Sequence, residues 1–119
     1  MYEQTELDKE METLFYDIKE RAELVERFIE EGLIGFKINQ LAGVVQNSFG
    51  RMREELNQEE YKELIVKYKE TTEESVKGIK QEIEERKNNL GIISEEKLIV
   101  EVEYIEKKIN EIIEKAKEL

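Results

Sequence analysis

The most regular pattern in the chain lies at Leu98–Leu119, LIVEVEYIEKKINEIIEKAKEL. Apolar residues recur there at alternating steps of four and three, from Leu98 through Ile105 and Ile112 to Leu119. That spacing places them along one side of an α-helix and leaves the charged residues on the other side. Ser94 precedes the segment and suits an N-cap, so we expect a helix over residues 95–118.

Two further segments carry the same helical spacing. One apolar seam runs from Met11 to Ile29, and a second runs from Tyr61 to Ile83. Charged residues fill most of the positions between them, which is typical of helices that bury one side and expose the other. We therefore expect helices over residues 5–31 and 58–88.

A local signal marks where the second of these helices begins. Asn57-Gln58-Glu59-Glu60 has the spacing of a capping box, in which the side chains of Asn57 and Glu60 each accept a hydrogen bond from the other residue's backbone N–H. A helix that begins at Gln58 in this way is separate from any helix that ends before Asn57.

The segment Ile38–Gly50, INQLAGVVQNSFG, departs from the composition of the rest of the chain. It contains no charged residue, whereas 41% of all residues are charged. Apolar residues at helical spacing from Ile38 to Leu56 predict a helix over residues 36–56 with one buried side. The opposite side of that helix is uncharged and glycine-bearing, and it comprises Phe36, Asn39, Gly43, Gln46, Asn47 and Gly50.

This uncharged side is the candidate functional site, and three interpretations compete for it. It could be buried inside a monomer, with its amides bonded internally. It could meet a second copy of the chain or another protein, because glycines allow another backbone to approach closely and Phe36 or Phe49 could serve as anchors. It could also line a pocket for a small molecule.

The segments together predict an all-α fold, an antiparallel four-helix bundle that forms a single domain over residues 1–119. Short connections favour antiparallel neighbours, and 119 residues are enough for one core. The alternative arises if the Asn57 cap is not used. The helices over 36–56 and 58–88 would then fuse into one long rod, which would find its core in an intertwined helical oligomer.

The composition narrows the classes of function. The chain has no histidine and no cysteine, which removes disulfides, zinc sites and thiol or Ser-His nucleophiles. Its net charge is −11 and no segment forms a basic patch, so we expect neither direct nucleic-acid binding nor binding to anionic membranes. No run of residues is long and apolar enough to be a signal peptide or membrane span, which predicts a cytoplasmic protein. No cofactor is predicted.

Three further groups of residues have simpler explanations. Tyr68, Thr72 and Ser75 could line a cavity, but Thr and Ser commonly bond back to the carbonyl four residues earlier. Paired glutamates could hold Mg²⁺, as in the all-α nucleotide pyrophosphohydrolases, in which a Glu-x-x-Glu pair is followed by a Glu-x-x-Asp pair. The Glu-x-x-Asp pair is absent from this chain, and most of its Glu-x-x-Glu pairs lie off the apolar seams. The acidic first helix could imitate a nucleic-acid phosphate track, but such a surface also simply keeps a protein dispersed in water.

The sequence therefore predicts a non-enzymatic protein–protein interaction, assembly or regulatory module. It would self-associate or bind another protein through the uncharged face of the helix over 36–56. Two alternatives remain: a Mg²⁺-dependent all-α enzyme that uses clustered glutamates, and an acidic inhibitor protein that mimics nucleic acid.

Overall fold

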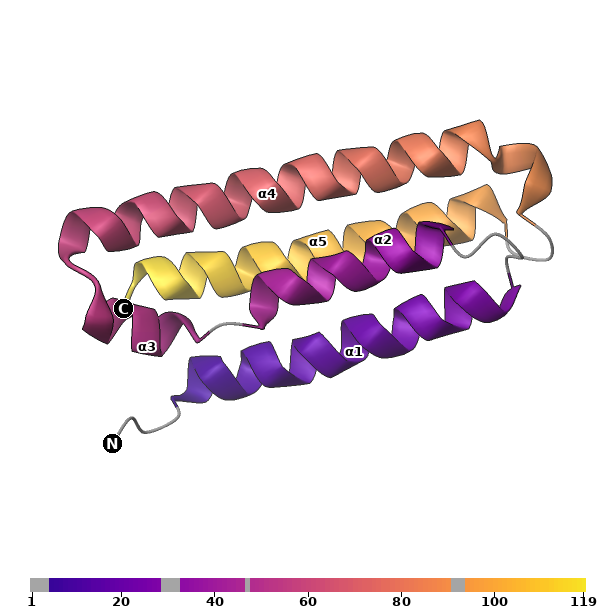
Figure 1. Ribbon diagram of the computed structural model, residues 1–119. Helices are drawn as coiled ribbons and strands as arrows, with labels where there is room; N and C mark the ends of the chain where they lie inside the picture. Colours follow the sequence, from indigo (N-terminus) through magenta and orange to yellow (C-terminus); the bar gives the residue numbers. More distant parts are fainter. Residues whose placement is uncertain (1–4, 29–32, 47, 91–93) are drawn as a thin grey trace.

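The computed structural model is all-helical over the residues that it describes, which are 5–28, 33–46, 48–90 and 94–119 (Figure 1). These residues form five α-helices and two short 3₁₀ helices and contain no strand. The elements in chain order are α1 (Glu6–Phe28), α2 (Leu33–Leu41), η1 (Ala42–Val45), α3 (Phe49–Glu55), α4 (Gln58–Glu85), η2 (Lys87–Asn89) and α5 (Glu95–Lys117).

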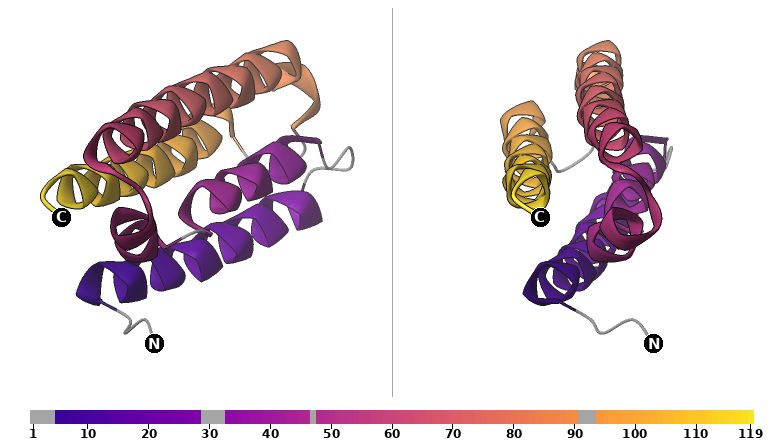
Figure 2. Two further views of the ribbon diagram at one scale, coloured as in Figure 1. Left: turned by 60° about the vertical axis from the view of Figure 1, so that its left-hand side comes forward. Right: turned by 90° about the vertical axis from the view of Figure 1, so that its left-hand side faces the viewer.

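The four longer helices lie side by side in an elongated molecule of 48 × 23 × 18 Å (Figures 1 and 2). α1 packs against α2, α2 against α4, α4 against α5, and α5 against α1. In Figure 1, α1 and α4 run in one direction and α2 and α5 run back in the other. The short α3 lies at the end of the molecule where α4 begins and α5 ends.

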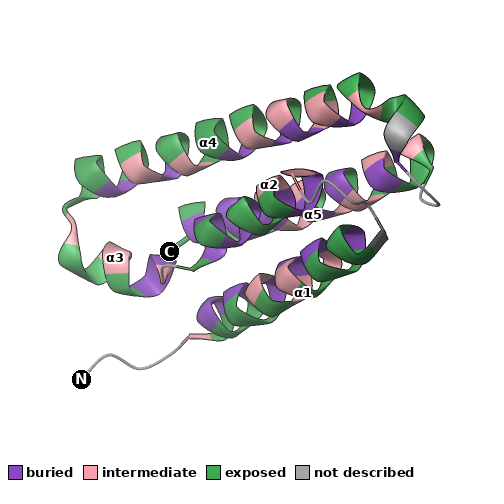
Figure 3. Cartoon of the chain, turned by 45° about the vertical axis from the view of Figure 1, so that its right-hand side comes forward, coloured by how far each residue is buried: buried purple, intermediate pink, exposed green. Residues whose placement is uncertain are grey.

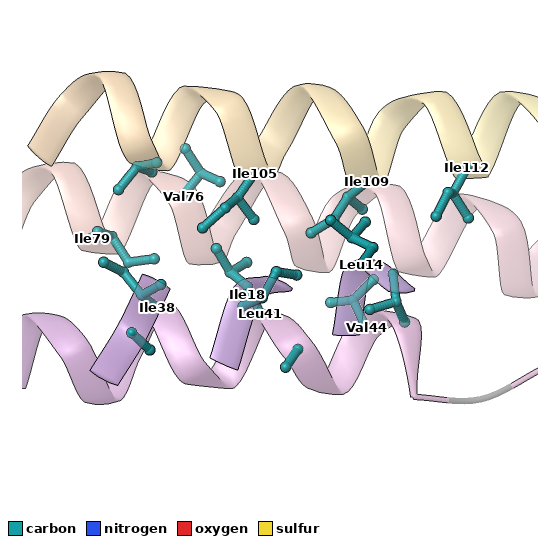
Figure 4. Close-up of a cluster of buried hydrophobic side chains, with 14 of the residues drawn as sticks. Leu14, Ile18, Ile38, Leu41, Val44, Val76, Ile79, Ile105, Ile109 and Ile112 are labelled. Carbon is teal, nitrogen blue, oxygen red and sulfur yellow. The ribbon is translucent and has the colours of Figure 1, made fainter. Parts of the chain in front are cut away.

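The buried side chains form one hydrophobic cluster between these helices (Figure 4). The buried residues lie on the sides of the helices that face one another, and the residues on the outer sides are exposed (Figure 3). Figure 4 labels ten members of the cluster: Leu14, Ile18, Ile38, Leu41, Val44, Val76, Ile79, Ile105, Ile109 and Ile112. The predicted apolar seams therefore supply the core.

Three of the predicted helices are present with small differences at their ends. α1 ends at Phe28, and the predicted end at Glu31 lies outside the described residues. α4 ends at Glu85 and is followed by η2, so it is shorter than the predicted 58–88. α5 begins after Ser94, whose side chain accepts a hydrogen bond from the backbone N–H of Lys97, as expected for an N-cap.

The capping box at Asn57 is confirmed and separates α3 from α4. The Asn57 side chain accepts a hydrogen bond from the Glu60 N–H at 2.9 Å, and the Glu60 carboxylate accepts one from the Asn57 N–H at 3.1 Å. Leu56 has an extended backbone, with φ −102° and ψ 151°. The long rod considered as an alternative is therefore not formed.

The predicted continuous helix over 36–56 is wrong. Helical structure begins earlier, at Leu33, but α2 ends at Leu41 and η1 ends at Val45. The chain then restarts as α3 at Phe49, because Ser48 has an extended backbone and its hydroxyl oxygen accepts a hydrogen bond from the Arg51 N–H at 3.0 Å. An N-cap of this kind begins a new helix and cannot lie inside an existing one.

A contact from the start of α1 holds this break in place. The Ser48 hydroxyl donates a hydrogen bond to Asp8 Oδ1 at 2.7 Å, and Asp8 is almost completely buried. The other oxygen of Asp8 accepts a hydrogen bond from the Thr5 N–H at 3.1 Å, and the Thr5 hydroxyl accepts one from the Asp8 N–H. One carboxylate therefore joins the cap of α1 to the cap of α3.

Candidate functional site

The candidate site lies on the outer side of α2 and η1, and we call it the neutral face. It consists of exposed residues without charge: Phe36, Asn39, Gln40, Gly43 and Gln46. Four of them were predicted from the sequence, and Gln40 was not. Phe36 is the large apolar residue of the group, and its side chain is 54% exposed.

One predicted member of the site, Gly50, and one candidate anchor, Phe49, are not part of this face, and a second predicted member cannot be placed. Gly50 is buried in α3, on the far side of the break at Ser48. The sequence predicts Gly50 on the same side as Gly43 only if one continuous helix spans both residues. The break at Ser48 removes that alignment. Phe49, considered as an anchor, is fully buried in the core with its ring 5.0 Å from that of Tyr68. Asn47 lies outside the described residues.

The single charge near the start of the neutral face is directed away from it. Lys37 points to α4, where its ammonium nitrogen lies 3.5 Å from a carboxylate oxygen of Glu82. Glu82 also accepts a hydrogen bond from Arg86 at 2.7 Å and is only 15% exposed. The pairing fixes α2 against α4 and leaves the outer side of α2 electrically neutral.

A close approach on the inner side of α2 fixes the helix against α1. A Cβ atom placed on Gly35 would overlap Cγ of Glu26 and lie 3.0 Å from the carbonyl oxygen of Ala22. A side chain at this position would therefore displace the exposed Glu26 side chain and press on the backbone of α1. Packing against α1 favours glycine here.

Gly43, on the outer side, has the opposite surroundings. A Cβ atom placed there would meet nothing within 4 Å among the described residues. Packing within the described part of the chain therefore gives no reason for a glycine at this position.

A shallow groove begins at Gly43 and runs between η1 and α4. Its volume is about 310 Å³. Its walls are largely apolar. The ionisable side chains that line it are those of Lys67 and Tyr68. The lining residues are Gln40, Gly43, Val44, Leu64, Lys67, Tyr68 and Thr71. The contributions of α4 could not be found from the sequence, because they depend on which helix packs beside α2.

A groove on the opposite side of the molecule has a different chemistry. It lies between α1 and α5, has a volume of about 670 Å³ and is lined by five acidic and three basic residues. Lys115 crosses it to bind Glu10 at 2.7 Å. Nearby, Arg21 pairs with Asp17 and with Glu101. Burial lowers the pKa of Arg21, but the two carboxylates outweigh it and raise that pKa above its ordinary value. The charges of this surface are largely satisfied within the chain.

The other candidates from the sequence have structural explanations. Thr72 is fully buried and its hydroxyl donates a hydrogen bond to the Tyr68 carbonyl at 2.8 Å, which is the back-bonding expected of a threonine in a helix. Among the described residues, no group of three or more acidic side chains is close enough together to hold a metal ion. The paired glutamates therefore do not converge there on a metal site.

Comparison of this chain with models of protein families, with curated proteins and with solved structures finds no match. None of the described helices is both long and apolar enough to cross a membrane.

Proposed function

We propose that this chain is a non-enzymatic interaction module of the cytoplasm that self-associates as a homodimer through its neutral face. We further propose that α1, α2, α4 and α5 act as one antiparallel four-helix bundle that holds this face rigidly. The observation that carries the proposal is the pairing of an exposed phenylalanine with an exposed glycine that no neighbour in the described chain explains.

Electrostatics supports a second copy as the partner. Each chain has a net charge of −11, so two copies repel one another wherever their acidic surfaces meet. Salt screens charges that are separated by more than about 8 Å, but it does not screen charges in direct contact across an interface. The neutral face is a part of the surface on which two acidic copies can touch without bringing like charges together.

The order of residues on this face fits two-fold symmetry. In an antiparallel pair of α2 helices, an axis that passes between Asn39 and Gln40 places Phe36 of one copy opposite Gly43 of the other. The same axis places Asn39 opposite Gln40, so that an amide faces an amide and each can donate and accept a hydrogen bond. A large ring thus meets the residue without a side chain, twice, beside the groove that begins at Gly43.

The test compares two variants that each add one negative charge. Gly43→Glu places a carboxylate in the proposed contact, where an uncompensated buried charge weakens association by at least about a hundredfold. Val100→Glu places the same charge on the outer side of α5, where Val100 is 63% exposed, and should leave the dissociation constant unchanged. Sedimentation velocity measures both. Equal effects of the two variants would contradict the proposal.

A second substitution tests the antiparallel register. Phe36→Lys in combination with Gly43→Glu places an ammonium group of one copy opposite the new carboxylate of the other, so association should recover by about fivefold or more relative to Gly43→Glu alone. A parallel arrangement separates these positions and predicts no recovery.

A further inference from the structure

A second surface, at the end of the molecule where α3, the start of α4 and the end of α5 meet, combines apolar side chains with cations (Figure 1). A groove of about 610 Å³ lies there. The apolar part of its lining consists of Tyr61, Ile65, Val66 and Leu119, and its basic part consists of Arg53, Lys62 and Lys117.

The apolar floor of this groove is packed against the core and joined across two helices. Tyr61 and Ile65 are each only 4% exposed, and the Tyr61 hydroxyl donates a hydrogen bond to the Ala116 carbonyl, which joins α4 to α5. Burial raises the pKa of the Tyr61 phenol, although the Arg53 cation lowers it in part, so the phenol stays neutral. Val66 and Leu119 are 55% and 45% exposed, which leaves apolar surface open to an occupant.

The cations of this groove are unusual for such an acidic chain. The chain has 30 acidic and 19 basic residues, yet the groove is lined by three basic side chains and a single acidic one, Glu118. Within the described residues, neither Arg53 nor Lys62 forms an ion pair. The Arg53 guanidinium instead lies 5.4 Å from the centre of the Tyr61 ring, in a cation–π contact.

We propose that this groove binds a single-chain amphipathic carboxylate, a small molecule with an alkyl chain and one anionic head group. The alkyl chain covers the floor formed by Tyr61, Ile65 and Val66, and the head group lies between Arg53 and Lys62. Acidic side chains farther than about 8 Å from the head group are largely screened at physiological salt, and in the lining of the groove the basic side chains outnumber the acidic one. A large polyanion would reach those acidic surfaces and be repelled.

The test is a titration with sodium decanoate, kept below its micelle-forming concentration and followed by ¹H–¹⁵N NMR. Decanoate should give saturable shifts of the Tyr61 and Val66 amide signals, whereas 1-decanol and decyltrimethylammonium, with the same alkyl chain, should bind about tenfold more weakly or worse. Equal binding of the three probes, or decanoate shifts centred on another surface, would overturn the proposal.

Matched variants test the role of the cations. The double variant Arg53→Gln/Lys62→Gln should weaken decanoate binding by about tenfold or more, because each solvent-accessible cation contributes up to about fivefold. Its affinity for 1-decanol should stay the same. Lys77→Gln removes one exposed charge farther along α4 and should change neither affinity. The dispersion of the NMR spectrum shows whether each variant is folded, and a folded double variant with unchanged decanoate affinity would contradict the assignment.

Discussion

The two glycines of the α2–η1 segment, Gly35 and Gly43, have opposite surroundings. Gly35 faces α1, and a Cβ atom there would collide with Glu26 and press on the carbonyl oxygen of Ala22. Gly43 faces outward, and a Cβ atom there would meet nothing within 4 Å in the described chain. The first glycine is explained by packing within the molecule. The second has no such contact in the described chain, and we propose that a contact with a second molecule explains it.

The largest difference between the two sides of α2 should appear when large apolar side chains are truncated. Ile38 is fully buried, so Ile38→Ala should lower the free energy of unfolding by about 2–5 kcal/mol. Phe36→Ala on the exposed side should change it by no more than about 0.5 kcal/mol. Urea unfolding measures both.

Self-association would add to these values, because a partner that binds only the folded state raises the apparent stability. Both substitutions are therefore made in the Gly43→Glu background. If Phe36→Ala lowers the free energy of unfolding in this background as much as Ile38→Ala does, then Phe36 belongs to the core of the monomer. The distinction between the two sides of α2 would then fail.

The second prediction concerns the inner glycine. Gly35→Ala should lower the free energy of unfolding by about 1–3 kcal/mol, the usual cost of overpacking a tight contact. Chemical denaturation of the single variant gives this value. The same substitution with Glu26→Ala removes the collision with the flexible side chain and leaves only the contact with the Ala22 carbonyl, so the cost should shrink. An unchanged or raised stability for Gly35→Ala alone would show that packing against α1 does not explain the glycine.

The smallest effect is expected at the outer glycine, and it has the opposite sign. Gly43→Ala should raise the stability of the monomer by about 0.5 kcal/mol, because alanine loses less backbone entropy on folding and nothing in the described chain obstructs its methyl group. The same variant should self-associate more weakly, because the methyl group occupies space proposed for Phe36 of the other copy. A loss of monomer stability would mean that Gly43 has a structural role within the chain.

Much of the fold could be predicted from local pattern. α1, α4 and α5 follow from apolar residues at helical spacing, and the caps at Asn57 and Ser94 follow from single residues. These features are predictable because a long helix with one buried side repeats its signal many times, and a cap needs only its own side chain.

The break between η1 and α3 could not be predicted in this way. Ser48 lacks the acidic or amide residue three positions later that completes a capping box, because Arg51 stands there. Its hydroxyl is held by Asp8, which is 40 residues away in the sequence. The break determines which residues form the site, because it places Gly50 in the core and leaves Gly43 exposed. It cannot be located from the sequence without the tertiary contact between Asp8 and Ser48.

Sedimentation equilibrium of the wild-type chain over a wide range of concentration tests the proposed self-association most directly. We expect the average mass to rise with concentration from the 14.2 kDa of one chain toward twice that value, and the mass of Gly43→Glu to stay at 14.2 kDa throughout. A wild-type mass of 14.2 kDa at every concentration would contradict a homodimer formed through the neutral face.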